Sequence, residues 1–340
     1  MSPEISAESD PLQYQVVTDL AEILAIAPAW DALLLRSDCN RAFSSPVWFT
    51  AACRHNSSLK PHVITARRGR QLVGVLPLVL THPGRVAAFP NYMSDYSDII
   101  VSRGDSTVAR GLLERACSPP NGYQRILLSN IRQDSNCLRA LQTTNSRLST
   151  RPSFREIVTC YYLSLPASHE DFLRTKGSRF RKRLKRLHCC ADNRNFAMRE
   201  LKPDTFPPDR LPEVFLQLHL ERRNVKSCFE LPRAQAFVTE VVPRLFKSEN
   251  MRAIAMAEGD RLVGIDLYTM GRKSLCAWNG GFLAEAENCS PGKLLIEAGI
   301  KLALALKLEE YDFMRGPEIY KTSWANGSRC VGEVEFEVAH

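Results

Sequence analysis

The feature that most constrains the fold of this chain is a hairpin sequence that occurs twice, 190 positions apart (259 − 69). The segment Gly69-Arg70-Gln71-Leu72-Val73-Gly74-Val75 has its counterpart in Gly259-Asp260-Arg261-Leu262-Val263-Gly264-Ile265. In both copies a helical pattern and a strand pattern precede the glycine turn, and a return strand follows it. A repeat at about half the chain length indicates duplicated domains rather than a solenoid of short units.

The length and the loop pattern agree with two domains. A chain of 340 residues can build two ordinary hydrophobic cores. Residues 141–155 are rich in Ser, Thr, Asn and Arg and are typical of a connecting loop. We therefore expect an N-terminal domain at 1–155 and a C-terminal domain at 156–340. Because each copy mixes helices with strands, the predicted class is α/β (α+β), with a mixed twisted sheet flanked by helices in each domain.

The second copy continues into a helix start that can hold an anion. A strand with a double-glycine break, Cys276 to Phe282, is followed by a polar loop and then by Ser290-Pro291-Gly292. Ser290 is a favourable N-cap, Pro291 suits the first helical position, and Gly292 leaves the first free N–H donors accessible. Those donors and the helix dipole favour a phosphate. The alternative is that Ser-Pro-Gly is a plain helix cap.

The C-terminal half resembles the catalytic half of a GNAT acyltransferase. More narrowly, residues 290–295 (SPGKLL) and 312–321 (DFMRGPEIYK) are similar to the C-terminal signature of the CelD-type acetyltransferases. These are tandem-GNAT proteins associated with exopolysaccharide synthesis and related to the FemAB aminoacyl transferases. The resemblance implies two tandem GNAT-like domains and acyl transfer, with acetyl-CoA or another acyl-CoA as co-substrate and no tightly bound cofactor. The implied acceptor is an amine or hydroxyl of a sugar or polysaccharide precursor.

One departure from the family leaves the donor open. The usual GNAT pyrophosphate loop, Arg/Gln-x-x-Gly-x-Gly/Ala, is absent from this sequence. A FemAB-like enzyme that uses aminoacyl-tRNA is therefore the first alternative. The second alternative is a non-catalytic assembly protein with a decayed donor site.

The candidate site residues fall into three groups. The resemblance implies that the strand edge at residues 278–280 and the strand at 311–313 part to admit the acyl arm. The donor-binding group is Trp278, Asn279, Gly280, Ser290, Pro291, Gly292 and Lys293. The catalytic group supplies a general base from Asp266, Asp312 or Glu318 and also contains Arg315, Tyr320 and Lys321. For Arg315 a structural ion pair with Glu318 or Asp312, and for Lys321 a plain surface position, are the alternatives. The substrate-binding group is Arg222, Arg223, Tyr268, Tyr92 and Asp95.

The first copy lacks the equipment of the second. Its corresponding helix opens at Asp105-Ser106-Thr107 without a Pro-Gly, and its last strand has no Arg-Gly-x-Glu-x-x-Lys sequel. We interpret this domain as structural and as one wall of an acceptor site. Tyr92 and Asp95 then line that wall, or else they belong to an ordinary loop.

A basic helix is expected at residues 172–190. Residues 174–186 hold eight Lys or Arg side chains, and the formal net charge of the whole protein is also +8. Leu173, Phe180, Leu184 and Leu187 recur at helical spacing, so one stripe of this helix should be docked. Such a segment attracts polyanions, and tRNA is one candidate partner. The alternatives are a solvated helix face or a plain role in the fold.

Composition also bears on the compartment. The N-terminal residues show no basic region followed by an apolar run, so we expect no signal peptide. The most apolar helix pattern, 294–308, is too short to cross a membrane. The 11 cysteines include no Cys-x-x-Cys pair, so we expect them to stay reduced and to hold no metal, Cys189-Cys190 included. The predicted location is the cytoplasm.

Overall fold

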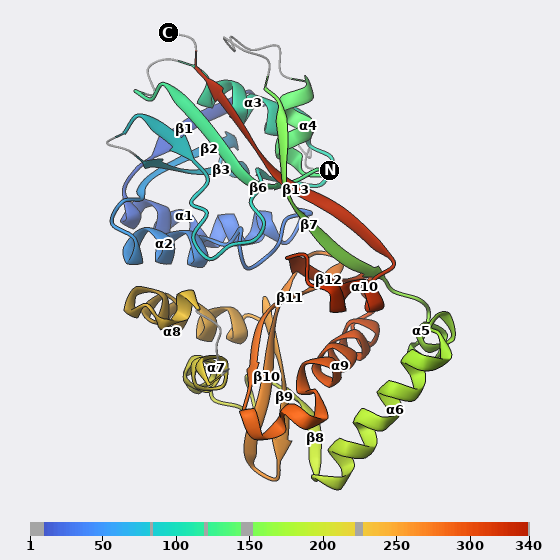
Figure 1. Cartoon of the computed structure of the whole chain (residues 1–340). Helices are drawn as coiled ribbons and strands as arrows, with labels where there is room; N and C mark the ends of the chain where they lie inside the picture. Colours follow the sequence, from blue (N-terminus) through green and yellow to red (C-terminus); the bar gives the residue numbers. More distant parts are fainter. Residues whose placement is uncertain (1–9, 82–83, 119–121, 144–151, 222–226, 339–340) are drawn as a thin grey trace, which may run out of the picture. The chain divides into compact units, whose positions relative to one another are not determined.

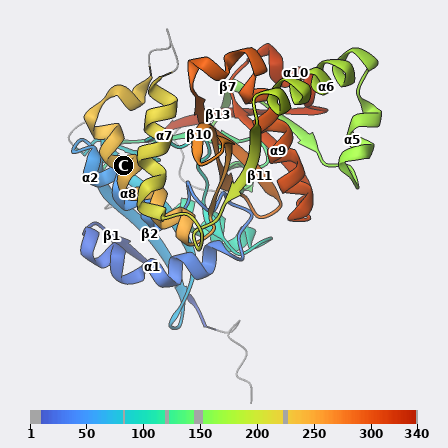
Figure 2. The same ribbon diagram turned by 90° about the horizontal axis from the view of Figure 1, so that it is seen from below.

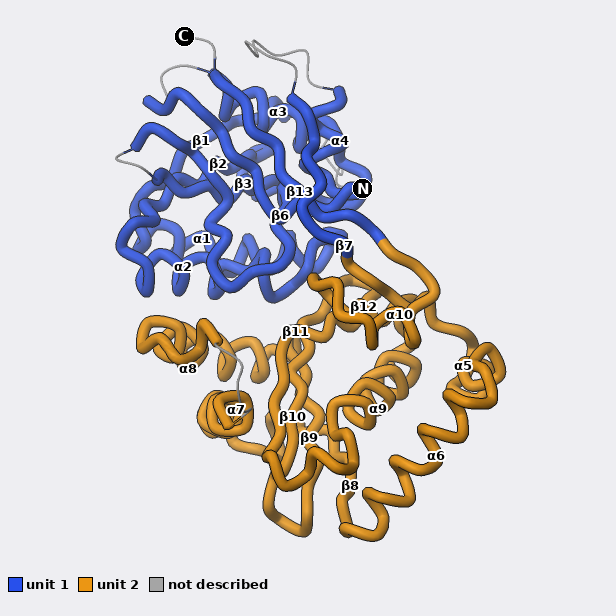
Figure 3. The backbone as a smooth tube through the Cα atoms, viewed as in Figure 1, with its two compact units in different colours: residues 1–159, 329–340 blue, residues 160–328 orange. Residues whose placement is uncertain are grey.

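The computed structural model describes residues 10–81, 84–118, 122–143, 152–221 and 227–338 (Figures 1 and 2). The chain forms two compact units (Figure 3). Unit 1 comprises residues 1–159 and 329–340, and unit 2 comprises residues 160–328.

Unit 1 is a mixed sheet with the strand order β1–β2–β3–β4–β6–β13, and the short β5 pairs with β3. All neighbours are antiparallel except β4 and β6, which are parallel. Its core packs strand residues such as Ile64 and Leu76 against Val108 and Leu112 of α3. The elements of this unit are β1 (Leu12–Val17), α1 (Leu20–Leu34), α2 (Pro46–His55), β2 (Lys60–Arg68), β3 (Gln71–Thr81), β4 (Val86–Ala88), β5 (Ile100–Val101), α3 (Ser106–Ala116), β6 (Arg125–Arg132), α4 (Asn136–Thr143) and most of β13 (Gly327–Glu337).

Unit 2 repeats this plan with the strand order β7–β12–β11–β10–β9–β8. Here too one pair, β11 and β12, is parallel, and the other neighbours are antiparallel. Helices α7 and α8 cover one face of the sheet, and α6 and α9 lie on the other (Figure 2). Its elements are the second half of β7 (Phe154–Ser164), α5 (His169–Thr175), α6 (Ser178–Asn193), β8 (Phe196–Leu201), η1 (Pro208–Arg210), α7 (Leu211–Leu220), η2 (Cys228–Glu230), α8 (Pro232–Lys247), β9 (Met251–Glu258), β10 (Arg261–Met270), β11 (Ser274–Phe282), η3 (Ala284–Cys289), α9 (Pro291–Ala305), β12 (Glu310–Arg315) and α10 (Ile319–Trp324).

The repeated hairpin sequence marks the same position in both units. It forms the turn and return strand of β2–β3 in unit 1 and of β9–β10 in unit 2. The shared glycine has a packing reason, because a Cβ at Gly74 would overlap Val108 and Leu112 of α3. Gly264 faces α9 in the same way, with Leu295 within 3.5 Å of the position of a Cβ. The prediction of two α/β domains with mixed, helix-flanked sheets is thus confirmed.

The two repeats exchange their last strands. β7 follows the first repeat in the chain but pairs with β12 of the second, at Glu310↔Ser164 and Tyr311↔Leu163. β13 follows the second repeat but pairs with β6 of the first, at Val331↔Arg132 and Phe336↔Ile126. This exchange is why residues 329–340 belong to unit 1, whereas one domain was expected over all of 156–340.

The basic segment is not one helix. The predicted helix at 172–190 is divided into α5, ending at Thr175, and α6, beginning at Ser178. Lys176 and Gly177 between them have extended backbone angles, with ψ of 142° and 159°. Phe172, Phe180 and Trp324 form an aromatic cluster that packs the two helices against α10, with the Phe172 and Trp324 rings stacked at 6.0 Å.

Candidate functional site

In unit 2 the two parallel strands β11 and β12 part after three paired positions. The ladder joins Ser274↔Glu310, Leu275↔Tyr311 and Cys276↔Asp312 and ends there. β11 then continues to Phe282 along β10, whereas β12 continues to Arg315 along β7. Register shifts at Leu267/Tyr268 of β10 and at Asp312/Arg315 of β12 accompany the divergence. The facing edges of residues 277–282 and 313–315 therefore offer main-chain N–H and C=O groups to a ligand between them.

Asp312 and Lys321 shape the β12 side of this opening. The Asp312 carboxylate is fully buried and accepts a hydrogen bond from the Met314 N–H at 2.7 Å, and Met314 has a left-handed backbone with φ of 60°. Lys321 is 3% exposed, and its Nζ donates to the carbonyls of Arg315 at 2.6 Å and Met314 at 3.4 Å. It also forms an ion pair with Glu318 at 2.9 Å. Both residues hold the chain end of β12 in place.

The buried Lys321 corrects one expectation. From the sequence, Lys321 was expected to be a catalytic lysine or an ordinary surface lysine. Instead α10 places the ammonium under the 314–316 turn, where carbonyl oxygens and Glu318 take up its donors. Asp312 is likewise enclosed, so its carboxylate is a poor candidate for a base that must meet solvent or substrate.

The tip of α9 is open, as the sequence indicated, but not for the reason given there. The helix begins at Pro291, yet Ser290 has a left-handed backbone (φ 48°, ψ 62°) and its side chain makes no cap hydrogen bond. A Cβ added at Gly292 would meet only the ring of Phe282, 4.0 Å away. The prediction of Ser290 as a side-chain N-cap is therefore wrong, and its failure leaves the first-turn N–H donors free of a side-chain acceptor.

Lys293 lies at this tip, and the charge of Arg183 acts on it. Lys293 lies in the first turn of α9, and burial, followed by the positive charge of Arg183 on α6, lowers the pKa of its ammonium. Because the sequence separates these two residues by 110 positions (293 − 183), nothing in it pointed to Arg183 as a neighbour of the tip. The tip thus combines helix N–H groups with two like charges, a combination that favours an anion.

The matching helix of unit 1 is closed to anions. At the start of α3 the Asp105 carboxylate accepts a hydrogen bond from the Val108 N–H at 3.1 Å. A carboxylate at this position satisfies the helix donors and repels a phosphate. The difference between Asp105 and Ser290 therefore separates the two repeats.

Asp266 is the one predicted carboxylate that lies at the parting and is only half-buried. It sits opposite Gly280 in the β10–β11 register, and a Cβ at Gly280 would overlap its Oδ1. The Tyr268 hydroxyl lies 3.3 Å from Asp266 and donates to the Leu295 carbonyl at 3.0 Å. Tyr311, whose ring centre is 6.1 Å from that of Tyr268, completes the cluster.

The tyrosines of this cluster are not accessible. Both are fully buried, and burial raises the pKa of Tyr268 and of Tyr311 well above the ordinary tyrosine value. Tyr268 was a predicted substrate ligand, but its hydroxyl instead ties α9 to the sheet. The pair therefore provides a rigid, neutral wall behind Asp266.

The other predicted residues fall in different places. The Trp278 indole is buried on the α7 face, where it stacks on Phe215 at 5.9 Å, so only its backbone can meet a donor. Asn279 and Gly280 are half-exposed on the edge of β11. His219 lies between Gly280 and Ser227, 2.9 Å from the carbonyl oxygen of the first and 2.9 Å from the hydroxyl of the second.

The remaining predicted residues form three pairs: one lies just past the end of β12, one lies outside the described residues, and one lies in unit 1. Arg315 is half-buried and Tyr320 is 44% exposed, just past the end of β12. Arg222 and Arg223 lie outside the described residues. Tyr92 and Asp95 are half-buried in unit 1, where the Tyr92 carbonyl accepts from the Trp48 indole N–H at 3.0 Å.

The basic segment separates into engaged and unengaged cations. Arg174 forms ion pairs with Glu170 at 2.8 Å and Asp171 at 2.7 Å, and Lys176 donates to the Trp324 carbonyl at 2.7 Å. Arg181 binds main-chain carbonyls of Leu173 and Lys176. Within the described part of the chain, no ion pair or hydrogen bond engages the other five side chains, which are exposed on α6: Arg179, Lys182, Arg183, Lys185 and Arg186.

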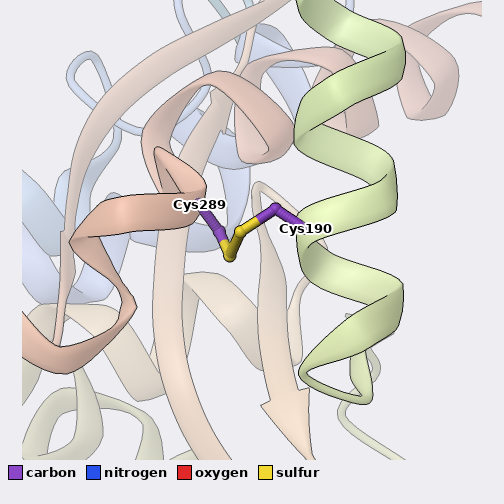
Figure 4. The surroundings of a disulfide bond; sticks show 2 residues. All are labelled: Cys190 and Cys289. Atoms are coloured by element: carbon purple, nitrogen blue, oxygen red, sulfur yellow. A yellow bond between two sulfur atoms is a disulfide. The ribbon is translucent and has the colours of Figure 1, made fainter.

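A disulfide joins α6 to the segment before α9. Cys190 and Cys289 are bonded with an S–S distance of 2.06 Å (Figure 4). The expectation that every cysteine stays reduced is therefore wrong; the two partners are 99 residues apart, and no spacing rule connects them.

In the described residues no group of three or more His, Cys, Asp or Glu side chains is arranged to hold a metal. Among those residues, every helix is too short or too polar to span a bilayer.

Comparison with known proteins gives one family match. Residues 173–322, which run from the end of α5 into α10, match the model of the acetyltransferase (GNAT) domain. A search of curated protein sequences finds no match.

Solved structures match over nearly the whole chain. The crystal structure of FemX has a TM-score of 0.65 at 11% identity and covers 96% of this chain and 97% of its own. The C-terminal domain of a putative lysylphosphatidylglycerol synthetase from Agrobacterium fabrum has a TM-score of 0.60 at 11% identity, with 93% and 92% covered. A tandem GNAT protein from the clavulanic acid biosynthesis pathway has a TM-score of 0.46 at 13% identity, with 97% and 99% covered. The first two likenesses show the fold alone. The family match within unit 2 supports an acyltransferase.

Proposed function

We propose that unit 2 binds an activated acyl carrier between β11 and β12, with an anionic group at the tip of α9, and transfers the acyl group directly to an acceptor amine or hydroxyl. The observation that carries the proposal is that the parted strands and the open helix tip adjoin at Phe282 and Gly292. A strand edge suits the amide groups of a pantetheine arm, and the tip suits a pyrophosphate. An acyl-CoA, with acetyl-CoA first, has both parts.

Direct transfer needs few groups. The acceptor nitrogen or oxygen attacks the thioester carbonyl, the tetrahedral adduct collapses with loss of the CoA thiolate, and the acceptor proton passes to a base. We assign that base to Asp266, because it is the half-exposed carboxylate at the parting. A main-chain N–H on the free edge of β11, near Asn279, would stabilise the oxyanion. Arg315 and Tyr320 lie past the strand end, where they would orient the acceptor or donate a proton to the leaving thiolate.

The proposal gives unit 1 a supporting role. Asp105 closes its helix tip, so the donor site belongs to unit 2 alone. Tyr92, Asp95, Arg222 and Arg223 stay candidates for acceptor binding. The sugar or polysaccharide precursor as acceptor rests on the CelD-type resemblance, and the cytoplasm stays the proposed location.

The unengaged cations of α6 favour a second candidate, an aminoacyl-tRNA carrier. Five exposed cations, which have no acidic partner among the described residues, form a surface that a phosphate backbone would neutralise. The name of the putative lysylphosphatidylglycerol synthetase, whose C-terminal domain shares the fold of this chain, includes a lysyl group. In this variant the tRNA phosphates bind α6, and the aminoacyl ester enters between the same two strands.

A binding panel separates the candidates. The purified chain is titrated with acetyl-CoA, a long-chain acyl-CoA and an aminoacyl-tRNA, and the melting temperature and Kd are measured. An acyl-CoA carrier predicts a rise in melting temperature with acyl-CoA and a weak dependence of tRNA binding on the acyl group. A tRNA carrier predicts a rise in melting temperature with aminoacyl-tRNA instead, and tRNA binding that depends strongly on the acyl group. It also predicts that the slope of log K against log salt falls when α6 cations are removed.

The control for this slope is Arg174→Gln, since Arg174 is already paired within α5. Lys182→Gln and Lys185→Gln should each reduce the slope by about one, and Arg174→Gln should leave it unchanged. A chain that binds none of the three ligands, and whose function in cells survives the Asp266→Asn substitution, would instead be a non-catalytic assembly protein.

A further inference from the structure

The disulfide Cys190–Cys289 lies at the element that the proposed function uses. Cys289 ends η3 and directly precedes Ser290, the residue before the α9 tip. Cys190 lies in the last turn and a half of α6, the helix that carries Arg183. Figure 4 shows the bond bridging α6 to the short helical segment before α9. The bond therefore connects the anion-binding tip to the helix with the unengaged cations.

Besides the Phe180 ring in its cluster with Phe172 and Trp324 and the Arg181 hydrogen bonds, helix α6 has few other anchors in its unit. Of its 16 residues, only Leu184 and Ala191 are buried. Its polar link to α9 is the contact of His188 Nε2 with Glu297 at 2.6 Å, and Glu297 also contacts His169 of α5 and Lys301. A helix with so little buried apolar surface is drawn from the low end of local stability.

Electrostatics oppose the closure of α6 on the tip. Arg183 and Lys293 carry like charges that sense one another, and the other exposed cations of α6 lack acidic partners within the described residues. Like charges at close range repel unless an anion lies between them. A covalent bond that holds the two elements together keeps these charges ready for an anion and removes the cost of bringing them together.

We propose that Cys190–Cys289 is a reversible thiol–disulfide centre that sets the affinity of the α9 tip for its anionic donor. This inference rests on the proposed function for the identity of the donor. With the bond closed, α6 holds Arg183 beside Lys293 and the donor binds tightly. With the bond open, α6 loosens, the like charges separate and the donor binds weakly.

The exchange uses a dithiol as reductant. One thiolate of the dithiol attacks Sγ of Cys190, which is partly exposed, whereas Cys289 is only 1% exposed. The S–S bond breaks, the Cys289 thiolate leaves and takes up a proton, and a mixed disulfide with Cys190 remains. The second thiol of the reductant then attacks the mixed disulfide, which releases Cys190 as a thiol and closes the disulfide of the reductant. The reverse reaction takes two electrons from the cysteine pair and gives them to a small-molecule disulfide such as oxidised glutathione.

The test uses the full chain in two states, treated either with oxidised glutathione or with dithiothreitol. Counting maleimide-reactive thiols on the unfolded protein should show two more in the reduced state, at Cys190 and Cys289. Hydrogen exchange of the α6 amides should become faster on reduction, and trypsin should cleave at the exposed α6 cations sooner. The Kd for acetyl-CoA should rise about fivefold or more on reduction, the range of an ordinary coupling between sites.

Matched variants localise the effect. Cys190→Ser should behave as the reduced chain in both states, whereas Cys189→Ser, which removes the adjacent exposed thiol, should keep the redox response. Equal α6 exchange rates in the two states would overturn the clamp, as would Cys190 and Cys289 thiols that remain labelled after oxidation. If reduction frees α6 but neither state binds acetyl-CoA, the clamp stands and the acyl-CoA assignment fails.

Discussion

Substituting Ser290 by Asp would place a negative charge at the open tip of α9, as Asp105 does at the tip of α3. In α3 the Asp105 carboxylate accepts from the Val108 N–H at 3.1 Å, whereas the Ser290 side chain makes no cap bond. Ser290 has φ of 48°, a region that Asp and Asn enter more readily than other non-glycine residues. Ser290→Asp and Ser290→Asn therefore place side chains of equal shape at the tip, and they differ by one charge.

The size of the effect follows from that charge. A carboxylate at about 6 Å from a pyrophosphate with about two negative charges, at an effective dielectric constant of about 60, costs about 2 kcal/mol. Neutralising the attraction of the helix N-terminus adds about 0.5–1 kcal/mol. We therefore expect Ser290→Asp to raise the Kd for acetyl-CoA about 50-fold to 150-fold. Ser290→Asn should stay within about threefold of the wild type.

Isothermal titration of both variants at low salt measures this difference. Raising the salt concentration should narrow the gap between Asp and Asn, because the tip is open to solvent. Ser290→Asp should not lower the melting temperature, since a negative charge near a helix N-terminus interacts favourably with the helix dipole. If Ser290→Asp bound acetyl-CoA as tightly as Ser290→Asn, the tip would not hold the donor phosphates and the assignment of the site would be wrong.

Three further predictions test other parts of the structure. Asp266→Asn should lower kcat about 10²-fold or more with little change in KM and remove the acidic limb of the pH profile, whereas an unchanged profile would assign the base elsewhere. Lys321→Met should lower the free energy of unfolding by about 2–4 kcal/mol in urea titrations. The substitution leaves the carbonyls of Arg315 and Met314 and the Glu318 carboxylate without their donor. Glu318 contributes least to this loss because its side chain is half exposed. In unit 1, burial raises the pKa of Asp98 to about 6, despite hydrogen bonds from the N–H groups of Ile99, Asn136 and Cys137. Because the native state then binds its proton more tightly than the unfolded chain, this group adds stability below about pH 4 that is lost as pH rises to about 6, by up to about 3 kcal/mol. Asp98→Asn should flatten that part of the curve of unfolding free energy against pH, and an unaltered slope between these pH values would contradict the assignment.

The helices and strands named here could be predicted from the sequence because they depend on local residue patterns. The repeated Gly69–Val75 and Gly259–Ile265 hairpins predicted two like domains, and the same β3 and β10 positions carry them in the structure. Ser-Pro-Gly predicted a helix that begins at residue 291, because Pro291 has a helical φ whatever tertiary contacts the chain makes later. The parting of the strands at Cys276 and Asp312 was also expected, although from the family resemblance and not from the residues themselves.

The tertiary structure decided which of those residues face a ligand. Lysine is a residue type that usually lies on the surface, but α10 turns the Lys321 ammonium under the Arg315 carbonyl. No local sequence pattern encodes that burial. The alternation of side chains along β7 and β13 is the same whichever repeat each strand pairs with. The sequence alone therefore does not say which repeat supplies the partner strand. Cys190 bonds to Cys289, and the charge of Arg183 acts on Lys293, only because α6 packs against η3 and α9. Local backbone preferences fix the elements within a few residues, whereas contacts between residues about a hundred positions apart exist only once the sheet is assembled.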